Sequence, residues 1–224
     1  MTTFIFLRHA ISQANEEGIL AGRLPGINLS QKGNRQANEI SKYLQALKID
    51  RVISSPLERC LQTIDPFLSS AHLKVHKDEA FIEMDYGNWS GQKLSSLNKN
   101  KDWKVVQKKP STFKFPKGES FAAAQRRVEK GMASLAKSHP KKTLLVVSHG
   151  DIIKMVAAKT LNLSLDDFQR IVIDPASISI LSWKDKQRTV ITLNQRIIKP
   201  ERGKKRQKPG DYKHRRVLGG GKGE

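Results

Sequence analysis

The chain has 224 residues and a formal net charge of +20, with 41 Lys and Arg against 21 Asp and Glu. This length suits one domain with a full hydrophobic core, and the positive charge favours anionic substrates or anionic surfaces. A single cysteine excludes an internal disulfide, and no apolar run is long enough to cross a membrane. The N-terminal apolar stretch is too short for a signal peptide, so we expect a cytoplasmic protein.

Buried strands alternate with amphipathic helices along the chain. Short apolar runs predict strands over 3–8, 51–54, 73–76, 143–148, 178–183 and 189–193. Apolar residues at helical spacing predict helices over 31–47, from Ser55 onward, around 121–135 and from near Asp151. The alternation predicts an α/β fold, a three-layer α/β/α sandwich with a mostly parallel sheet and one antiparallel edge strand. The last two strands are expected to form a hairpin.

The helix after the second strand carries the most specific local signals. Ser55 and Glu58 have the spacing of a capping box, with Pro56 at the first helical position. Pro66 predicts a kink or a break. The buried face of this helix is expected to consist of Leu57, Leu61, Ile64 and Leu68.

Charge and composition divide the chain into two parts. Residues 196–224 hold 11 Lys and Arg against 3 Asp and Glu, whereas the rest holds 30 against 18. We expect 1–198 to form the folded domain, with the lysine-rich segment 93–117 as a lid-like insertion. The tail, 199–224, has few hydrophobic residues and is predicted to be disordered.

Two of the predicted strands end in a histidine. The run Phe4–Leu7 leads into Arg8 and His9, and Leu144–Val147 leads to His149. Groups at the carboxyl ends of neighbouring strands of an open α/β sheet converge on one crevice. Two histidines beside an arginine, whose guanidinium matches phosphate oxygens, indicate a phosphate site.

Four ordered motifs, together with Gly118–Ser120, extend this pattern. The segments Arg8–Asn15, Ser54–Thr63, Glu83–Gly91 and Ser148–Gly150 resemble the signature of the histidine phosphatase superfamily, in its phosphoglycerate-mutase-like branch. The resemblance runs from about residue 3 to residue 194. Within the superfamily the chain is most similar to small actinobacterial proteins described as phosphatases or phosphomutases.

This resemblance implies a role for each matched residue. His9 would be the nucleophile and form a phosphohistidine, and His149 would also be catalytic. Glu83 would protonate the leaving alcohol, although Asp85 and Glu79 lie close enough in the sequence to compete for that role. The phosphoryl group would be held by Arg8, Asn15, Arg59 and His149. The family's chemistry implies no metal and no other cofactor.

The chain departs from the family pattern at two places. Ala10 stands where most members have glycine, which we expect to be tolerated. The phosphoglycerate mutases carry Glu-Arg-His-Tyr-Gly at the acid, whereas this chain has Glu83-Met84-Asp85-Tyr86-Gly87. The mutase arginine is therefore missing, and hydrolysis is favoured over isomerisation. Arg23, in the loop after Asn15, is predicted either to contact a second anionic group of the substrate or to be a solvated loop cation.

The sequence thus predicts a phosphatase acting on a small phosphorylated substrate, with two alternatives. One is a phosphoglycerate-mutase-like phosphomutase of the same fold. The other is a non-catalytic protein that binds phosphate or nucleic acid, with weak nonspecific nucleic-acid contacts from the basic tail. The sequence does not predict the natural substrate or the oligomeric state.

Overall fold

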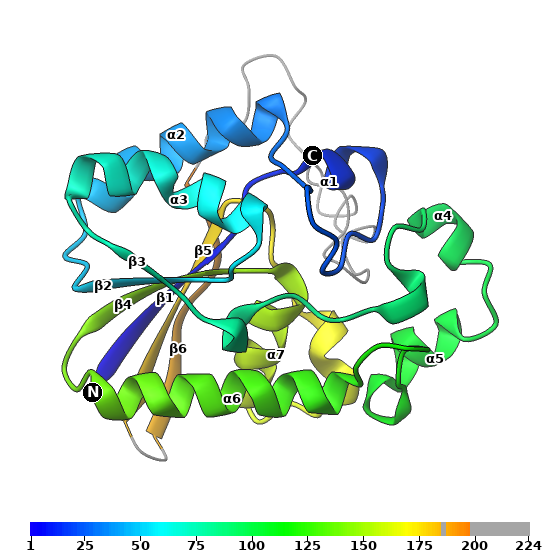
Figure 1. Cartoon of the computed structure of the whole chain (residues 1–224). Helices are drawn as coiled ribbons and strands as arrows, with labels where there is room; N and C mark the ends of the chain where they lie inside the picture. The colour runs from blue at the N-terminus through cyan, green and yellow to red at the C-terminus, as the bar shows by residue number, and fades with distance from the viewer. Residues whose placement is uncertain (185–186, 198–224) are drawn as a thin grey trace.

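A computed structural model of the chain describes residues 1–184 and 187–197, and these are built around one sheet (Figure 1). Its strands lie in the order β3-β2-β4-β1-β5-β6. They are β1 (Thr2–Arg8), β2 (Arg51–Ser54), β3 (Val75–Lys77), β4 (Thr143–Ser148), β5 (Ser177–Lys184) and β6 (Gln187–Arg196). The predicted tail, 199–224, lies outside the described residues.

The sheet is mostly parallel, as predicted. Strands β3, β2, β4 and β1 pair in parallel, whereas β5 is antiparallel to both β1 and β6. The predicted hairpin of the last two strands is confirmed. We expected the antiparallel strand at the edge of the sheet. It is β5 instead, which lies one position in from the edge, because β6 forms the edge.

Helices cover both faces of the sheet (Figure 1). On one face lie α2 (Gln31–Gln45) and α3 (Glu58–Ala71), and on the other lie α6 (Phe121–Ser138) and α7 (Gly150–Thr160). The shorter helices are α1 (Gln13–Glu17), α4 (Leu94–Leu97), α5 (Trp103–Lys108) and the 3-10 turns η1 (Glu79–Phe81), η2 (Gly87–Trp89), η3 (Pro110–Thr112) and η4 (Leu165–Arg170). The three-layer sandwich is therefore confirmed.

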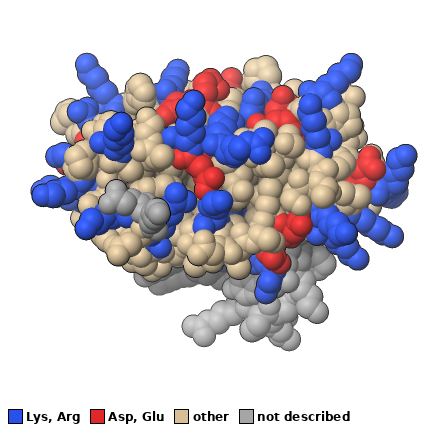
Figure 2. Space-filling model, turned by 90° about the horizontal axis from the view of Figure 1, so that it is seen from below, with Lys and Arg blue, Asp and Glu red and all other residues tan. Residues whose placement is uncertain are grey.

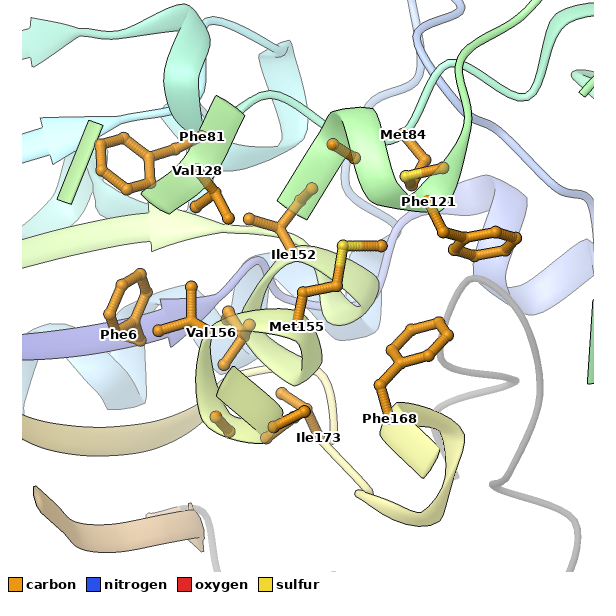
Figure 3. Close-up of a cluster of buried hydrophobic side chains, with 14 of the residues drawn as sticks. Phe6, Phe81, Met84, Phe121, Val128, Ile152, Met155, Val156, Phe168 and Ile173 are labelled. Carbon is orange, nitrogen blue, oxygen red and sulfur yellow. The ribbon is translucent and has the colours of Figure 1, made fainter. Parts of the chain in front are cut away.

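Two cores form because successive strand side chains point to opposite faces of the sheet. In β1, Phe4 and Phe6 join the cluster under α6 and α7, part of which is drawn in Figure 3. Ile5 and Leu7 join the cluster under α2 and α3. This double burial explains why the central strands contain unbroken apolar runs.

The helix α3 begins later than predicted. It starts at Glu58 with Leu57 at its N-cap, and no side chain caps it, so the expected capping box is wrong. The Ser55 hydroxyl lies instead 2.7 Å from Nε2 of His149. The Ser55 side chain, which the local sequence pattern assigned to the helix cap, therefore contacts His149, a residue that is distant in the sequence.

The buried face of α3 is also rotated from the predicted one. Leu57 and Ile64 are buried as expected, but Leu61 and Leu68 are half-buried. The buried residues are Arg59, Cys60, Thr63, Ile64 and Phe67, because the helix turns Arg59 toward the carboxyl ends of the strands. The helix continues through Pro66 to Ala71, so this proline does not break it.

The segment 93–117 is folded onto the α6 and α7 side of the molecule. It contains α4, α5 and η3, and it inserts Leu97, Val106 and Phe115 into the core cluster there. Its function as a lid stays a prediction.

Positive charge is scattered over the face that α6 covers. Lys and Arg side chains are spread over this face among uncharged residues, with a few Asp and Glu between them (Figure 2). Arg126, Lys130 and Lys137 of α6 are exposed. Over the described residues, no helix has the length and apolar character needed to span a membrane.

Candidate active site

The two predicted histidines lie together at the carboxyl ends of β1 and β4. Parallel pairing aligns Arg8 with Ser148, and the backbone N–H of His9 donates to the Ser148 carbonyl at 2.9 Å. The ring centres of His9 and His149 are 5.3 Å apart. The predicted convergence of the strand ends is therefore confirmed.

A backbone contact fixes the tautomer of His9. Its Nδ1 lies 2.7 Å from the Ala10 carbonyl oxygen, which can only accept a hydrogen bond. Nδ1 therefore carries the proton, and Nε2 carries the lone pair that a nucleophile needs. Burial, with the positive charges of Arg59 and Arg8, holds the pKa of His9 well below its usual value. The ring is neutral at neutral pH.

Alanine fits at position 10. Ala10 is fully buried and is not among the described residues with a positive φ, so its Cβ causes no backbone strain. Its N–H donates to the Thr63 hydroxyl at 2.9 Å, and that hydroxyl donates to the Arg59 carbonyl at 2.6 Å. Thr63, to which the sequence assigned no role, thus ties the loop after β1 to α3.

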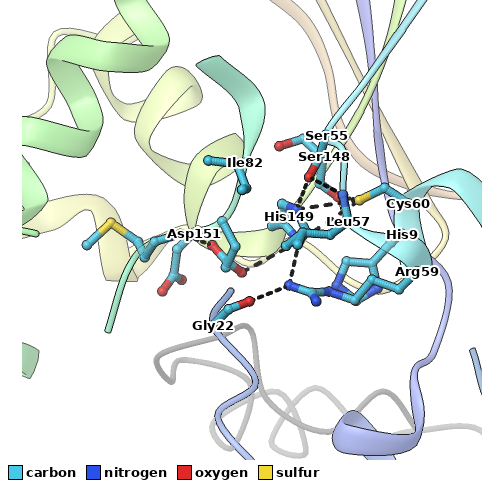
Figure 4. Close-up of polar contacts among 12 residues, drawn as sticks. His9, Gly22, Ser55, Leu57, Arg59, Cys60, Ile82, Ser148, His149 and Asp151 are labelled. Atoms are coloured by element: carbon cyan, nitrogen blue, oxygen red, sulfur yellow. Dashed lines mark hydrogen bonds and ion pairs between the residues drawn. The ribbon is translucent and has the colours of Figure 1, made fainter. Parts of the chain in front are cut away.

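The two predicted phosphate-binding arginines are both buried. One nitrogen of Arg59, Nη2, lies 2.8 Å from the Gly22 carbonyl and 3.1 Å from Nδ1 of His149 (Figure 4). Arg8 donates from Nη1 to the Ile173 carbonyl at 2.7 Å. A Cβ built on Gly150 would stand 3.3 Å from the guanidinium carbon of Arg8, so this side chain packs against the start of α7.

The tautomer of His149 is opposite to that of His9. The Arg59 guanidinium can only donate, so Nδ1 of His149 accepts and Nε2 carries the proton. Nε2 then donates to the Ser55 hydroxyl at 2.7 Å. Burial and the neighbouring Arg59 hold the pKa of His149 well below its usual value. Ser55 is a site residue that the sequence assigned to a helix cap.

Glu83 is the carboxyl group that faces the histidines. It is buried, and its Oε2 lies 3.9 Å from Nδ1 of His149. Burial and the nearby Asp151 raise the pKa of Glu83 to about 7, against the opposing charge of Arg59. The competing carboxylates point elsewhere, because Asp85 accepts from the Gly87 N–H and Glu79 is exposed.

A cluster of charged residues, Arg23, Arg127 and Glu119, holds the backbone around Glu83. Arg23 donates from Nε to the Glu83 carbonyl at 2.8 Å and from Nη2 to Glu119 at 2.9 Å. The same Glu119 oxygen accepts from Arg127 and from the Asp85 N–H, each at 2.9 Å. Arg23, the predicted substrate contact, is therefore bonded to the protein and positions Glu83.

Asn15 has a structural and a site-facing end. Its amide oxygen accepts from the N–H and the hydroxyl of Ser12, which together form the capping box of α1. Only the amide nitrogen can therefore donate to a ligand. Its role as a neutral donor to phosphate stays a prediction.

These residues surround a cleft of about 400 Å³. His9, Asn15, Arg59 and Glu83 line it directly, whereas Arg8, Arg23 and His149 are not among the lining residues. The rest of the lining consists of Ser12, Ala14, Gly18, Ile19, Leu20, Ala21, Gly22, Tyr86 and Leu94.

The opposite tautomers give a prediction that needs no substrate. At pH 7 and 25 °C, long-range ¹H–¹⁵N spectra of the imidazoles are expected to show both rings neutral, with the proton on Nδ1 of His9 and on Nε2 of His149. His9→Ala and His149→Ala assign the signals. The same tautomer for both rings, or a protonated ring at this pH, would contradict the geometry.

Comparison with known proteins agrees with this arrangement. Phosphoserine phosphatase 1 of Hydrogenobacter thermophilus is 30% identical over 196 residues, covering 87% of this chain and 92% of that protein. The adenosylcobalamin/alpha-ribazole phosphatase of Escherichia coli is 28% identical over 201 residues, covering 86% and 95%.

A solved structure extends the likeness to three dimensions. Phosphoserine phosphatase of Entamoeba histolytica, in complex with 3-phosphoglyceric acid, superposes with a TM-score of 0.79 at 25% identity, covering 88% of this chain and 98% of that one. The sequence pattern of the histidine phosphatase superfamily (branch 1) matches residues 4–196. The chain therefore belongs to the histidine phosphatase superfamily.

Proposed function

We propose that this chain hydrolyses phosphomonoesters through a phosphohistidine on Nε2 of His9. The observation that carries the proposal is the hydrogen bond from His9 to the Ala10 carbonyl, which leaves Nε2 unprotonated beside the cleft. The prediction of a phosphomonoester hydrolase is confirmed by the family and by relatives named as phosphatases.

In the first step, Nε2 of His9 attacks phosphorus and the phosphorus–oxygen bond of the ester breaks. Protonated Glu83 gives its proton to the departing alkoxide, which leaves as the alcohol. Arg59 and Asn15, which line the cleft, hold the non-bridging oxygens, and the positive charges of Arg59 and Arg8 balance the charge of these oxygens. His149 contributes by holding Arg59 through Nδ1, because its own proton is donated to Ser55. The raised pKa of Glu83 supports this role, because a carboxyl group must be protonated to act as an acid.

In the second step, the Glu83 carboxylate takes a proton from water. The oxygen of that water attacks phosphorus, the phosphorus–nitrogen bond breaks, and Nε2 of His9 recovers its lone pair. Phosphate leaves, and Glu83 is protonated for the next cycle. One carboxyl group therefore serves both steps, which requires a pKa near the working pH.

The segment after Glu83 supports hydrolysis over isomerisation. Met84 is buried in the core, and Asp85 accepts the Gly87 N–H, so neither offers a cation to a substrate carboxylate. We further propose a small phosphorylated substrate, a lid role for 93–117 and a cytoplasmic location, which the single buried cysteine, Cys60, supports.

The nucleophile is tested by removing its ring. Purified His9→Ala is expected to lose at least about 1,000-fold in phosphate release from p-nitrophenyl phosphate, because the covalent route is closed. The wild type is expected to keep its activity in EDTA, as the family resemblance implies. His76→Ala, which alters an exposed histidine of β3, is the control. Unchanged activity of His9→Ala would refute the mechanism.

The raised pKa of Glu83 predicts the pH profile. With an alkyl phosphate, kcat/KM is expected to fall tenfold per pH unit above about 7, where Glu83 loses the proton that it must donate. Protonation of His9 is expected to lower kcat/KM only well below pH 6.5, because the pKa of that ring is lowered. Glu83→Gln is expected to remove the alkaline limb.

The leaving group provides the control for this profile. Glu83→Gln is expected to lose about 100-fold or more on an alkyl phosphate and much less on p-nitrophenyl phosphate, whose leaving group needs no proton. The pH profiles of the wild type and of Glu83→Gln are measured on the same substrate, so ionisation of the substrate affects both profiles equally. Equal losses on the two substrates would exclude Glu83 as the acid.

The charged cluster around Glu119 predicts a remote effect on the acid. Glu119→Gln keeps the size of the side chain but removes the charge that holds Arg23 and Arg127. The expected loss in kcat on an alkyl phosphate is up to about 100-fold, with a much smaller loss on p-nitrophenyl phosphate, because Glu83 is misplaced. A uniform loss on both substrates would indicate a merely structural role.

The matched control for this variant is Glu129→Gln on α6. Glu129 also pairs with two cations, Lys159 and Arg188, and it does not line the cleft. Its substitution is expected to leave the leaving-group dependence of the rate unchanged. Thermal unfolding of both variants reports any general loss of stability.

A further inference from the structure

We propose that the alcohol released at this site is uncharged and places an apolar surface against the cleft, and that it carries no carboxylate. This inference rests on the proposed phosphatase function and concerns the substrate class of the same cleft. It follows from the chemistry of the side chains that line the cleft besides the phosphate-binding groups.

Some of these side chains form an apolar wall, and they come from three parts of the chain. Ile19 and Leu20 follow α1, Leu94 begins α4, and Tyr86 presents its ring from the segment after Glu83. The Tyr86 hydroxyl is turned away from a ligand, because it donates to Asp151 at 2.8 Å in the buried interior. A leaving group in this space therefore meets hydrocarbon and an aromatic ring.

Among the described residues, Arg59 is the cation that lines the cleft, and we assign it to the phosphoryl group. It contacts the Gly22 carbonyl and Nδ1 of His149. Arg23 is ion-paired with Glu119, and Lys93 is exposed and does not line the cleft. The other charged side chain in the lining is the carboxyl of Glu83.

A substrate carboxylate would be unfavourable in this position. It would lose water against Ile19, Leu20 and Leu94 without gaining a cationic partner among the described residues, and an anion left unpaired on burial costs free energy. An uncharged alcohol does not bear this cost and gains by burying apolar surface.

This selectivity differs from what the names of two of the similar proteins suggest. Phosphoserine, named for the Hydrogenobacter protein, and 3-phosphoglyceric acid, bound in the Entamoeba structure, both carry a carboxylate. Identities of 30% and 25% leave room for a different wall at the leaving-group side. The cleft of this chain is therefore expected to disfavour both compounds.

Two substrate pairs isolate the carboxylate. Isobutyl phosphate matches phosphoglycolate in shape, with two methyl groups in place of two carboxylate oxygens. Glycerol 3-phosphate matches 3-phosphoglycerate, with an alcohol in place of the acid. For the wild type, kcat/KM is expected to be at least about 10-fold higher for the uncharged member of each pair, measured by phosphate release at low ionic strength.

A cation placed on the wall is expected to reverse part of this preference. Leu94→Lys adds one at a half-buried lining position, and Leu94→Met is the control of similar length without charge. Leu94→Lys is expected to raise kcat/KM for phosphoglycolate relative to isobutyl phosphate by about 10-fold, an effect that added salt reduces. Leu94→Met is expected to leave the ratio unchanged. Thermal unfolding checks that both variants fold.

Each outcome decides between the two proposals. If the wild type hydrolyses the carboxylate members as fast as their partners or faster, and His9→Ala abolishes that activity, the inference about the alcohol is wrong and the phosphatase function stands. If Leu94→Lys folds and does not change the ratio, the role assigned to the wall is wrong. If no substrate releases phosphate, the proposed function itself fails.

Discussion

The parallel pairing of β1 with β4 is the constraint on which the site depends. It aligns Arg8 with Ser148, so the next residue of each strand is a histidine at the same edge of the sheet. A slip of one residue would turn every side chain of β1 to the opposite face and separate the two rings. The apolar cores on both faces prevent this slip, because Phe4 and Phe6 fit one core and Ile5 and Leu7 the other.

Hydrogen bonds then set the proton positions that chemistry needs. The Ala10 carbonyl places the proton of His9 on Nδ1, whereas Arg59 and Ser55 place that of His149 on Nε2. Burial acts in opposite directions on the two kinds of group, lowering the pKa of the histidines and raising that of Glu83. Neutral histidines therefore coexist with a carboxyl group that is partly protonated near pH 7.

Separate segments of the chain hold this arrangement together. In the loop at Gly22 and Arg23, the Gly22 carbonyl accepts a hydrogen bond from Arg59. The Arg23 guanidinium donates to the Glu83 carbonyl. Glu119, just before α6, joins Arg23 to Arg127. The phosphate side and the acid side of the cleft are thus connected by one loop, so a change at Glu119 reaches Glu83 without touching a substrate.

The sequence by itself determined the alternation of strands and helices, the two strand ends with their histidines, and the buried face of α6, because each is written in a local hydrophobic pattern. It did not determine the roles of Ser55, Arg23 and Glu119. Ser55 lies 94 positions from its partner His149, and Arg23 lies 96 from Glu119. In the local pattern, a serine before a helix fits the role of a helix cap as well as any other role. Only the tertiary structure decided between capping α3 and contacting His149, because His149 comes from a distant strand end.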